Sequence, residues 1–169
     1  TDSGEYYYLN LAPKPGGADV VVCGGREQCS PDYLIERNGF KFHSIEFVLA
    51  GGGTLNLRGK TYPLRPGTLF FYGPGIAHAI RTAPEAPMLK HFVDFRGKGL
   101  VRMVRSTPLG RSPLYTSDPL RIRGLFESLL ATGGRESLHI DRLCILLLQQ
   151  KMIDDGIADL IAKFVRMAA

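Results

Sequence analysis

The sequence contains no window of about 18 apolar residues, which is the minimum length of a membrane-spanning helix. It has three cysteines, an odd number and too few for a disulfide framework, and their spacing does not match a zinc site. We therefore expect free thiols in a reducing, cytoplasmic setting. Residues 1–5 contain neither an initiating Met nor a charged-then-apolar signal segment, which suggests a piece of a longer chain.

Neither positive nor negative charge is in large excess. The chain has 21 Lys and Arg against 16 Asp and Glu, a net charge of +5, and the basic residues are scattered along the sequence. This charge by itself does not indicate nucleic-acid binding. The 169 residues, 44% hydrophobic and 22% charged, are typical of one globular domain and exclude a disordered or fibrous chain.

Glycine and proline, by contrast, are abundant, with 20 and 11 residues, and they mark turns. Turn clusters recur about every eight residues at 51–53, 58–60, 65–67 and 73–75. The runs between and around them are rich in β-formers and predict strands at 19–23, 43–50, 54–57, 61–64, 68–72 and 88–95, with a loop at 82–87. Short strands at this spacing predict an antiparallel sandwich or barrel.

The periodicity becomes helical after residue 117. Asp118 and Pro119 form a typical N-cap and first-turn pair, and the glycines at 133–134 end that helix. A second helix is predicted over 138–152 and a third amphipathic segment over 157–165. The expected fold is therefore mainly β, with a barrel over 1–117 followed by C-terminal α-helices over 118–169.

Common catalytic motifs are missing. No two of the four histidines (His43, His78, His91 and His139) stand at metal-ligand spacing on one predicted element. The sequence also has no Gly-x-Ser-x-Gly elbow and no Gly-x-x-x-x-Gly-Lys phosphate loop. We therefore predict no catalytic residues, no metal site and no cofactor.

Three segments resemble the cupin-type sensor domain of AraC-family transcription regulators: residues 46–55, 59–69 and the Pro-Gly-Ile-Ala-His stretch at 74–78. Residues 84–86 and 92–95 fit the same pattern, so the resemblance extends over roughly 20–155. It implies a cupin-like (double-stranded β-helix, or jelly-roll) barrel that binds a small effector. It also implies that DNA is bound by a separate C-terminal domain, which is absent from this chain.

The resemblance also gives an effector site. If the inward faces of strands 43–50 and 88–95 line the barrel, the predicted ligand-binding residues are Phe42, Glu46, His78, Ile80, Lys90 and Phe92. Aromatic walls with a few polar groups suit a sugar or a similar polar metabolite. Ile80 replaces a polar aromatic residue of the arabinose-sensing member, so arabinose itself is not predicted.

Each of these residues also has a purely structural interpretation. Phe42, Ile80 and Phe92 could be ordinary core residues. Glu46 and Lys90 could form an ion pair without a ligand, and a ring hydrogen bond of His78 could close its turn. The tyrosines at 6–8 could form an arm over the barrel mouth or only an edge strand.

A partner is expected at the helix over 138–152. Its run of six apolar residues at 143–148 covers every face of a helix, so more than one side must be buried. The resemblance implies that this helix pairs two protomers, and the predicted dimer interface consists of Leu143, Leu146, Leu147 and Gln150. Alternatively, the segments at 119–131 and 155–168 could cover this helix within one chain.

A metal-dependent cupin enzyme, an isomerase or a dioxygenase, is the alternative function. Metal cupins use a His-x-His pair, a Glu and a later His, of which Glu46 and His78 match two. The paired histidines would fall at Phe40 and Phe42, or at Gly39 and Lys41 with a spacing longer by one. His43 has the opposite strand parity to Glu46, so we expect it to point away from such a site.

Overall fold

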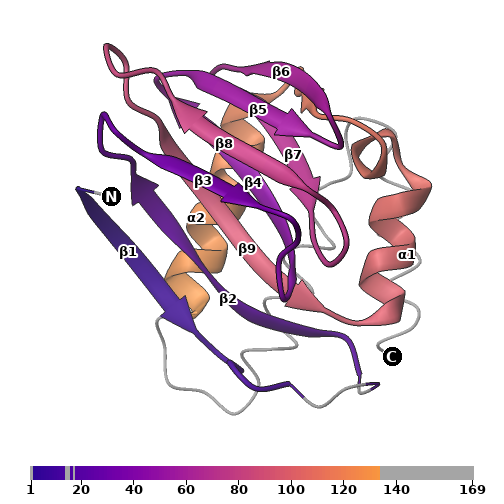
Figure 1. Ribbon diagram of the computed structural model, residues 1–169. Coiled ribbons are helices and arrows are strands. Elements are labelled where there is room, and N and C mark those ends of the chain that lie inside the picture. The colour runs from indigo at the N-terminus through magenta and orange to yellow at the C-terminus, as the bar shows by residue number, and fades with distance from the viewer. Residues whose placement is uncertain (1, 14–15, 17, 134–169) are drawn as a thin grey trace.

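The computed structural model describes residues 2–13, 16 and 18–133 of the chain. Within these residues, two antiparallel sheets face each other (Figure 1). The larger sheet has the order β1 (Ser3–Tyr8), β2 (Val20–Gln28), β9 (Leu89–Arg96), β4 (His43–Ala50), β7 (Thr68–Tyr72) and β10 (Leu114–Tyr115). The smaller sheet has the order β3 (Leu34–Arg37), β8 (His78–Thr82), β5 (Gly53–Leu57) and β6 (Lys60–Leu64). This is the mainly β, cupin-like fold that the sequence predicts.

Helices follow the sheets. They are α1 (Lys98–Ser106), the single 3-10 turn η1 (Pro108–Gly110) and α2 (Pro119–Gly133). The predicted cap of α2 is confirmed, since the Arg121 amide donates to the Asp118 Oδ1 at 3.0 Å. No helix in the described part of the chain is long and apolar enough to cross a membrane.

Strands β4 and β7 in the middle of the larger sheet are buried on both faces, which explains why apolar residues on them do not simply alternate with polar ones. The inner face of this sheet packs on the smaller sheet, and α2 packs on its outer face (Figure 1). The Phe126 ring of α2 stacks on the Phe47 ring and on the His91 ring, with centroid distances of 5.9 and 5.4 Å. Alternate residues of β4 therefore face either the barrel interior or the helices.

The predicted turns and strands agree closely with the structure. The strands predicted at 43–50 and 68–72 are observed with those bounds, and the other four differ from theirs only at their ends. Gly51 shows why one turn needs glycine: its φ is +70°, and a Cβ would lie 2.2 Å from the Pro87 carbonyl oxygen. The strands β3 and β8 and the helix α1 were not predicted.

The N-terminal tyrosines belong to an edge strand. Residues Ser3–Tyr8 pair with β2 along their whole length. The sequence left open an arm over the barrel mouth or an edge strand, and the observed pairing is that of an edge strand. The helix predicted over 138–152, with Leu143, Leu146, Leu147 and Gln150, and the segment over 157–165 lie outside the described residues.

Candidate functional site in the barrel interior

A buried ion triad lies between the two sheets. Lys90 Nζ of β9 is 2.7 Å from Glu46 Oε2 of β4 and 2.8 Å from Glu27 Oε2 of β2. The Lys90 and Glu46 side chains are only 3% and 2% exposed. Strand register brings the three together, because Lys90 pairs with Val48 on one side and with Glu27 on the other. Glu46 and Lys90 thus form the ion pair that the sequence allowed as a structural alternative to ligand binding.

The two glutamates determine the protonation state of Lys90. Burial alone lowers the pKa of the ammonium, but the nearby Glu46 and Glu27 carboxylates outweigh this effect and hold the pKa well above its usual range. Lys90 is therefore charged at physiological pH. With two carboxylates around one ammonium, the triad has a net negative charge.

Tyr72 connects the triad to His78. Its hydroxyl donates to Glu46 Oε1, and its ring stacks on the His78 imidazole with a centroid distance of 3.9 Å. Burial raises the pKa of the Tyr72 hydroxyl well above its usual value, and the Glu46 carboxylate raises it further. Tyr72 is therefore a permanent donor to Glu46.

His78 is both a turn residue and a neutral acceptor. Its Nδ1 lies 2.9 Å from the Ile76 carbonyl oxygen, so this nitrogen donates and the predicted turn-closing bond is confirmed. Burial lowers the pKa of the ring, partly offset by that hydrogen bond. Among the described residues, the buried Nε2 has no hydrogen-bond partner, which leaves one acceptor at the site unsatisfied.

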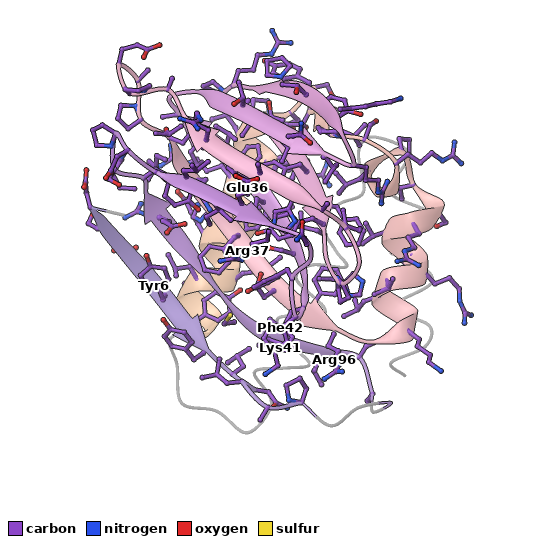
Figure 2. The ribbon with its side chains drawn as sticks, viewed as in Figure 1. Tyr6, Glu36, Arg37, Lys41, Phe42 and Arg96 are labelled. Atoms are coloured by element: carbon purple, nitrogen blue, oxygen red, sulfur yellow. The ribbon has the colours of Figure 1, made fainter. Side chains whose placement is uncertain are left out.

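Aromatic rings lie next to the polar cluster. Phe92 lies 6.1 Å from Tyr6 between ring centroids, and the Lys90 ammonium lies 5.7 Å from the Phe92 ring centroid. Phe42 packs edge-on against Phe40 at 6.0 Å in the loop before β4. Figure 2 shows Tyr6 on the edge strand β1 and Phe42 at the lower end of the barrel beside Lys41, and Tyr6 is 41% exposed.

The predicted site residues thus separate into three sets. Glu46, His78 and Lys90 belong to the polar cluster, while Phe42 and Phe92 belong to the aromatic wall. Ile80 is fully buried and pairs with Ile35 and Leu55 within the smaller sheet, which places it in the apolar core.

The sequence did not reveal Glu27 and Tyr72 as members of the cluster. Tyr72 lies on a predicted strand, and Glu27 lies on β2 beyond the part predicted at 19–23. Their contacts with Lys90 and Glu46 depend on which strands are neighbours in the sheet. For Tyr72, strand parity was the available signal. Tyr72 lies two residues from Phe70 on β7 and therefore shares its face of the sheet, and Phe70 pairs with Glu46.

Asp94 is a further titratable group on the same inner face. It pairs with Ser44 across β4, and the Cys23 thiol donates to its Oδ2 at 3.5 Å. Burial is the main cause that raises the pKa of Asp94, and the Glu46 charge also raises it, while the neighbouring Ser44 and Cys23 side chains and the Lys90 charge lower it, so that the pKa is about 6. Burial also raises the pKa of the Cys23 thiol to about 12, so this thiol is not a nucleophile.

The interior residues do not fit the metal site of a metal cupin. Glu46 Oε1 accepts from Tyr72 and Oε2 contacts Lys90, so both of its oxygens are engaged. His43 lies on the opposite face, as predicted, stacked on Phe71 and Phe95 at 5.6 and 5.9 Å. Within residues 2–13, 16 and 18–133, no group of three or more His, Cys, Asp or Glu side chains could hold a metal ion.

A buried polar cluster beside aromatic rings, held between two facing sheets, is a candidate small-molecule site. The sequence model of the family called AraC-like ligand binding domain matches residues 21–162, and the chain belongs to this family. Over 129 residues it is 26% identical to the arabinose operon regulatory protein of Salmonella typhimurium (strain LT2), covering 72% of this chain. The chain spans 46% of that relative's length.

Similar solved structures have low sequence identity. YhaK from Escherichia coli is 13% identical with a TM-score of 0.46, covering 56% of this chain and 45% of that chain. A cupin protein from Bacteroides fragilis is 12% identical with a TM-score of 0.39, covering 54% of this chain and 86% of that chain.

Proposed function

We propose that the barrel interior binds a neutral, hydroxyl-rich metabolite of the size of a sugar, and that this ligand is the effector of a transcription regulator. The observation that supports this most is the net negative Glu27–Lys90–Glu46 triad beside the Phe92 and Tyr6 rings. Anionic ligands would be repelled there, whereas hydroxyl groups can both donate and accept.

The roles of the site residues follow from their chemistry. Each carboxylate oxygen can accept two hydrogen bonds, so Glu46 and Glu27 accept from ligand hydroxyls beside their present contacts, and the third N–H of Lys90 donates to a ligand oxygen. His78 Nε2 is the unsatisfied acceptor for a further hydroxyl. The Phe92 and Phe42 rings cover the apolar face of the ligand.

A thermal-shift screen of the full-length protein tests this proposal. Neutral sugars and polyols of five or six carbons are tested beside the matching uronic and aldonic acids. We expect at least one neutral compound to raise the unfolding temperature in a saturable way, because a ligand that binds the native state stabilises it. The acids should give no shift. Binding of acids in preference to neutral sugars would contradict the proposed chemistry.

Regulation then depends on the rest of the protein. The relative of known function is named as an operon regulatory protein, and we infer that this domain acts with a DNA-binding domain in the cytoplasm. The effector would shift the protein between conformations through its differential affinity for them. We further propose two parts, a barrel over 1–117 and a dimerising helical segment over 118–169.

Sedimentation tests the dimer. In Leu146→Glu/Leu147→Glu, two charges enter the apolar run at 143–148, which we propose as the interface with Leu143 and Gln150. We expect the wild-type protein to sediment as a dimer and the variant as a folded monomer. An unchanged, stable mass would favour burial of this helix within one chain.

The alternative function, a metal-dependent isomerase or dioxygenase, would require Glu46 to bind the metal ion. Its two oxygens would have to leave Tyr72 and Lys90 before they could ligate a metal. We therefore propose that the domain is not an enzyme.

A further inference from the structure

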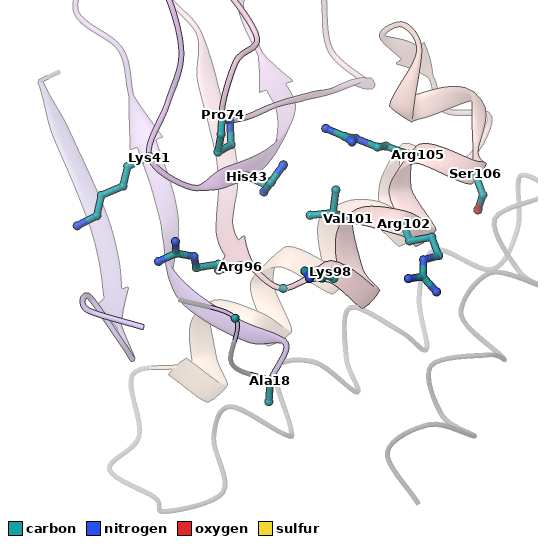
Figure 3. Close-up of a pocket in the computed structure, with 12 residues that line it drawn as sticks. Ala18, Lys41, His43, Pro74, Arg96, Lys98, Val101, Arg102, Arg105 and Ser106 are labelled. Atoms are coloured by element: carbon teal, nitrogen blue, oxygen red, sulfur yellow. The ribbon is translucent and has the colours of Figure 1, made fainter. Parts of the chain in front are cut away.

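A cavity lies outside the barrel, on the outer face of the larger sheet. It has a volume of about 750 Å³ and lies between the end of the barrel and α1 (Figure 3). Small-molecule sites typically have volumes of roughly 300–1,000 Å³. His43 lines this cavity, and its strand parity is opposite to that of Glu46, so this cavity is separate from the interior cluster.

Five cationic side chains line this cavity, which we call the basic cavity. They come from three parts of the chain: Lys41 precedes β4, Arg96 ends β9, and Lys98, Arg102 and Arg105 lie on α1. Positions 98, 102 and 105 are spaced four and three residues apart, so they share one face of the helix. The fold therefore corrects the impression of scattered basic residues, since five of the 21 Lys and Arg gather here.

These charges are not compensated locally. No Asp or Glu lines the basic cavity, and none of its five cations has an ion pair within the described part of the chain. Asp19 is nearby, but its carboxylate accepts from the amides of Gly99 and Leu100 at 3.0 and 3.1 Å. Asp19 thus caps α1, and the amides of Gly99 and Leu100 are not free to bind a ligand in the basic cavity.

The floor of the basic cavity is neutral. The His43 ring stacks on Phe71 and Phe95, and burial, with the nearby Arg105 charge, lowers its pKa to about 4. Pro74 and Val101 complete this floor. In Figure 3, Arg105 reaches across from α1 toward His43 and Pro74. A neutral floor under a cationic rim is suited to a small anion with a less polar body.

We infer that the basic cavity binds a phosphorylated small molecule. Phosphate oxygens match the planar guanidinium groups of Arg96, Arg102 and Arg105, and charge-assisted hydrogen bonds of this kind are about twice as strong as neutral ones. This ligand is opposite in chemistry to the neutral one proposed for the interior. The domain would then respond to two different signals, and this site does not depend on the interior one.

The concave shape favours a small molecule over a nucleic acid. Duplex DNA is bound by basic residues that follow its backbone over an extended surface. Here the cations line one hollow beside α1, where Arg105 reaches toward His43 and Pro74 (Figure 3).

Calorimetric titration of the full-length protein with inorganic pyrophosphate tests the inference. We compare the wild type with Arg102→Gln/Arg105→Gln and with the control Lys60→Gln/Arg81→Gln. The control removes the same charge from exposed positions on β6 and β8, away from the basic cavity. We expect saturable binding of one pyrophosphate per chain, weakened about tenfold or more in the first variant and by no more than about twofold in the control.

Three results would overturn the inference. The first is the absence of saturable binding by the wild type at low ionic strength. The second is an equal loss in both variants, which would show that only the overall charge matters. The third is unchanged pyrophosphate binding in Arg102→Gln/Arg105→Gln together with weakened binding of duplex DNA, which would make this face a DNA contact. The single variant Arg105→Gln serves if the double variant unfolds.

Discussion

Replacing Lys90 by methionine is expected to destabilise the protein by about 3–5 kcal/mol, the usual effect of removing one partner of a buried ion pair. Met has a similar length and leaves no large cavity, so the loss reports charge rather than packing. Without the ammonium, Glu46 and Glu27 remain close together in the interior with no cation between them. Urea unfolding followed by circular dichroism at neutral pH measures the difference.

A compensating variant separates this effect from simple disruption of the core. In Glu27→Gln/Glu46→Gln/Lys90→Met the interior charges are removed together, and we expect most of the lost stability to return. A loss below about 1 kcal/mol in Lys90→Met, the size of an exposed ion pair, would show that the triad is solvated in solution.

Replacing Asp94 by asparagine is expected to change how stability depends on pH. In the native state the pKa of Asp94 is raised, mainly by burial, from 3.8 to about 6. Between these values the native state holds a proton that the unfolded chain has released. The contribution of Asp94 to the free energy of unfolding therefore falls as the pH rises through this window, by about 3 kcal/mol in total.

The comparison across pH isolates this contribution from other carboxylates. We expect Asp94→Asn to gain stability relative to the wild type from about pH 4 to about pH 7, with the difference approaching 3 kcal/mol. Urea midpoints of both proteins across this range provide the test. Glu85→Gln, at an exposed position in the loop after β8, is the matched control. A difference between wild type and Asp94→Asn that does not vary with pH would contradict the raised pKa.

The strands of the barrel could be predicted because their limits are local. Gly51, Gly59, Gly67 and Gly75 all have positive φ, and such turns leave a clear pattern of Gly and Pro between apolar runs. The mainly β class followed from this pattern and strand parity gave the faces of Glu46 and Lys90, whereas the cupin-like barrel and the inward direction of those faces were implied by the family resemblance.

Helix α1 could not be predicted because its cap is distant in sequence. Gly97 and Gly99 at its start weaken any local helix signal, and Gly97 gives no side-chain cap. The capping carboxylate comes from Asp19, which lies 80 residues before Gly99. The basic cavity was missed for the same reason, since it exists only once α1 is placed beside β4 and β9.

The partners of Lys90 depended on strand order and register. Glu27 faces Lys90 only because β2 pairs with β9, and the pairing contains a register shift between Val21 and Cys23. Parity on one strand identifies a face, but it does not show which strand lies next to it. The interior triad is therefore a property of the sheet rather than of any one segment.

The most direct test of the interior site is a calorimetric titration of the best neutral ligand from the thermal-shift screen into Glu46→Gln. This variant keeps the size of the side chain and an oxygen that can accept from Tyr72, but it removes the carboxylate. The control Glu36→Gln makes the same change at an exposed position on β3. We predict that Glu46→Gln weakens binding by about tenfold or more while Glu36→Gln leaves it unchanged. Equal affinity in the two variants would contradict an effector site built around Glu46 and Lys90.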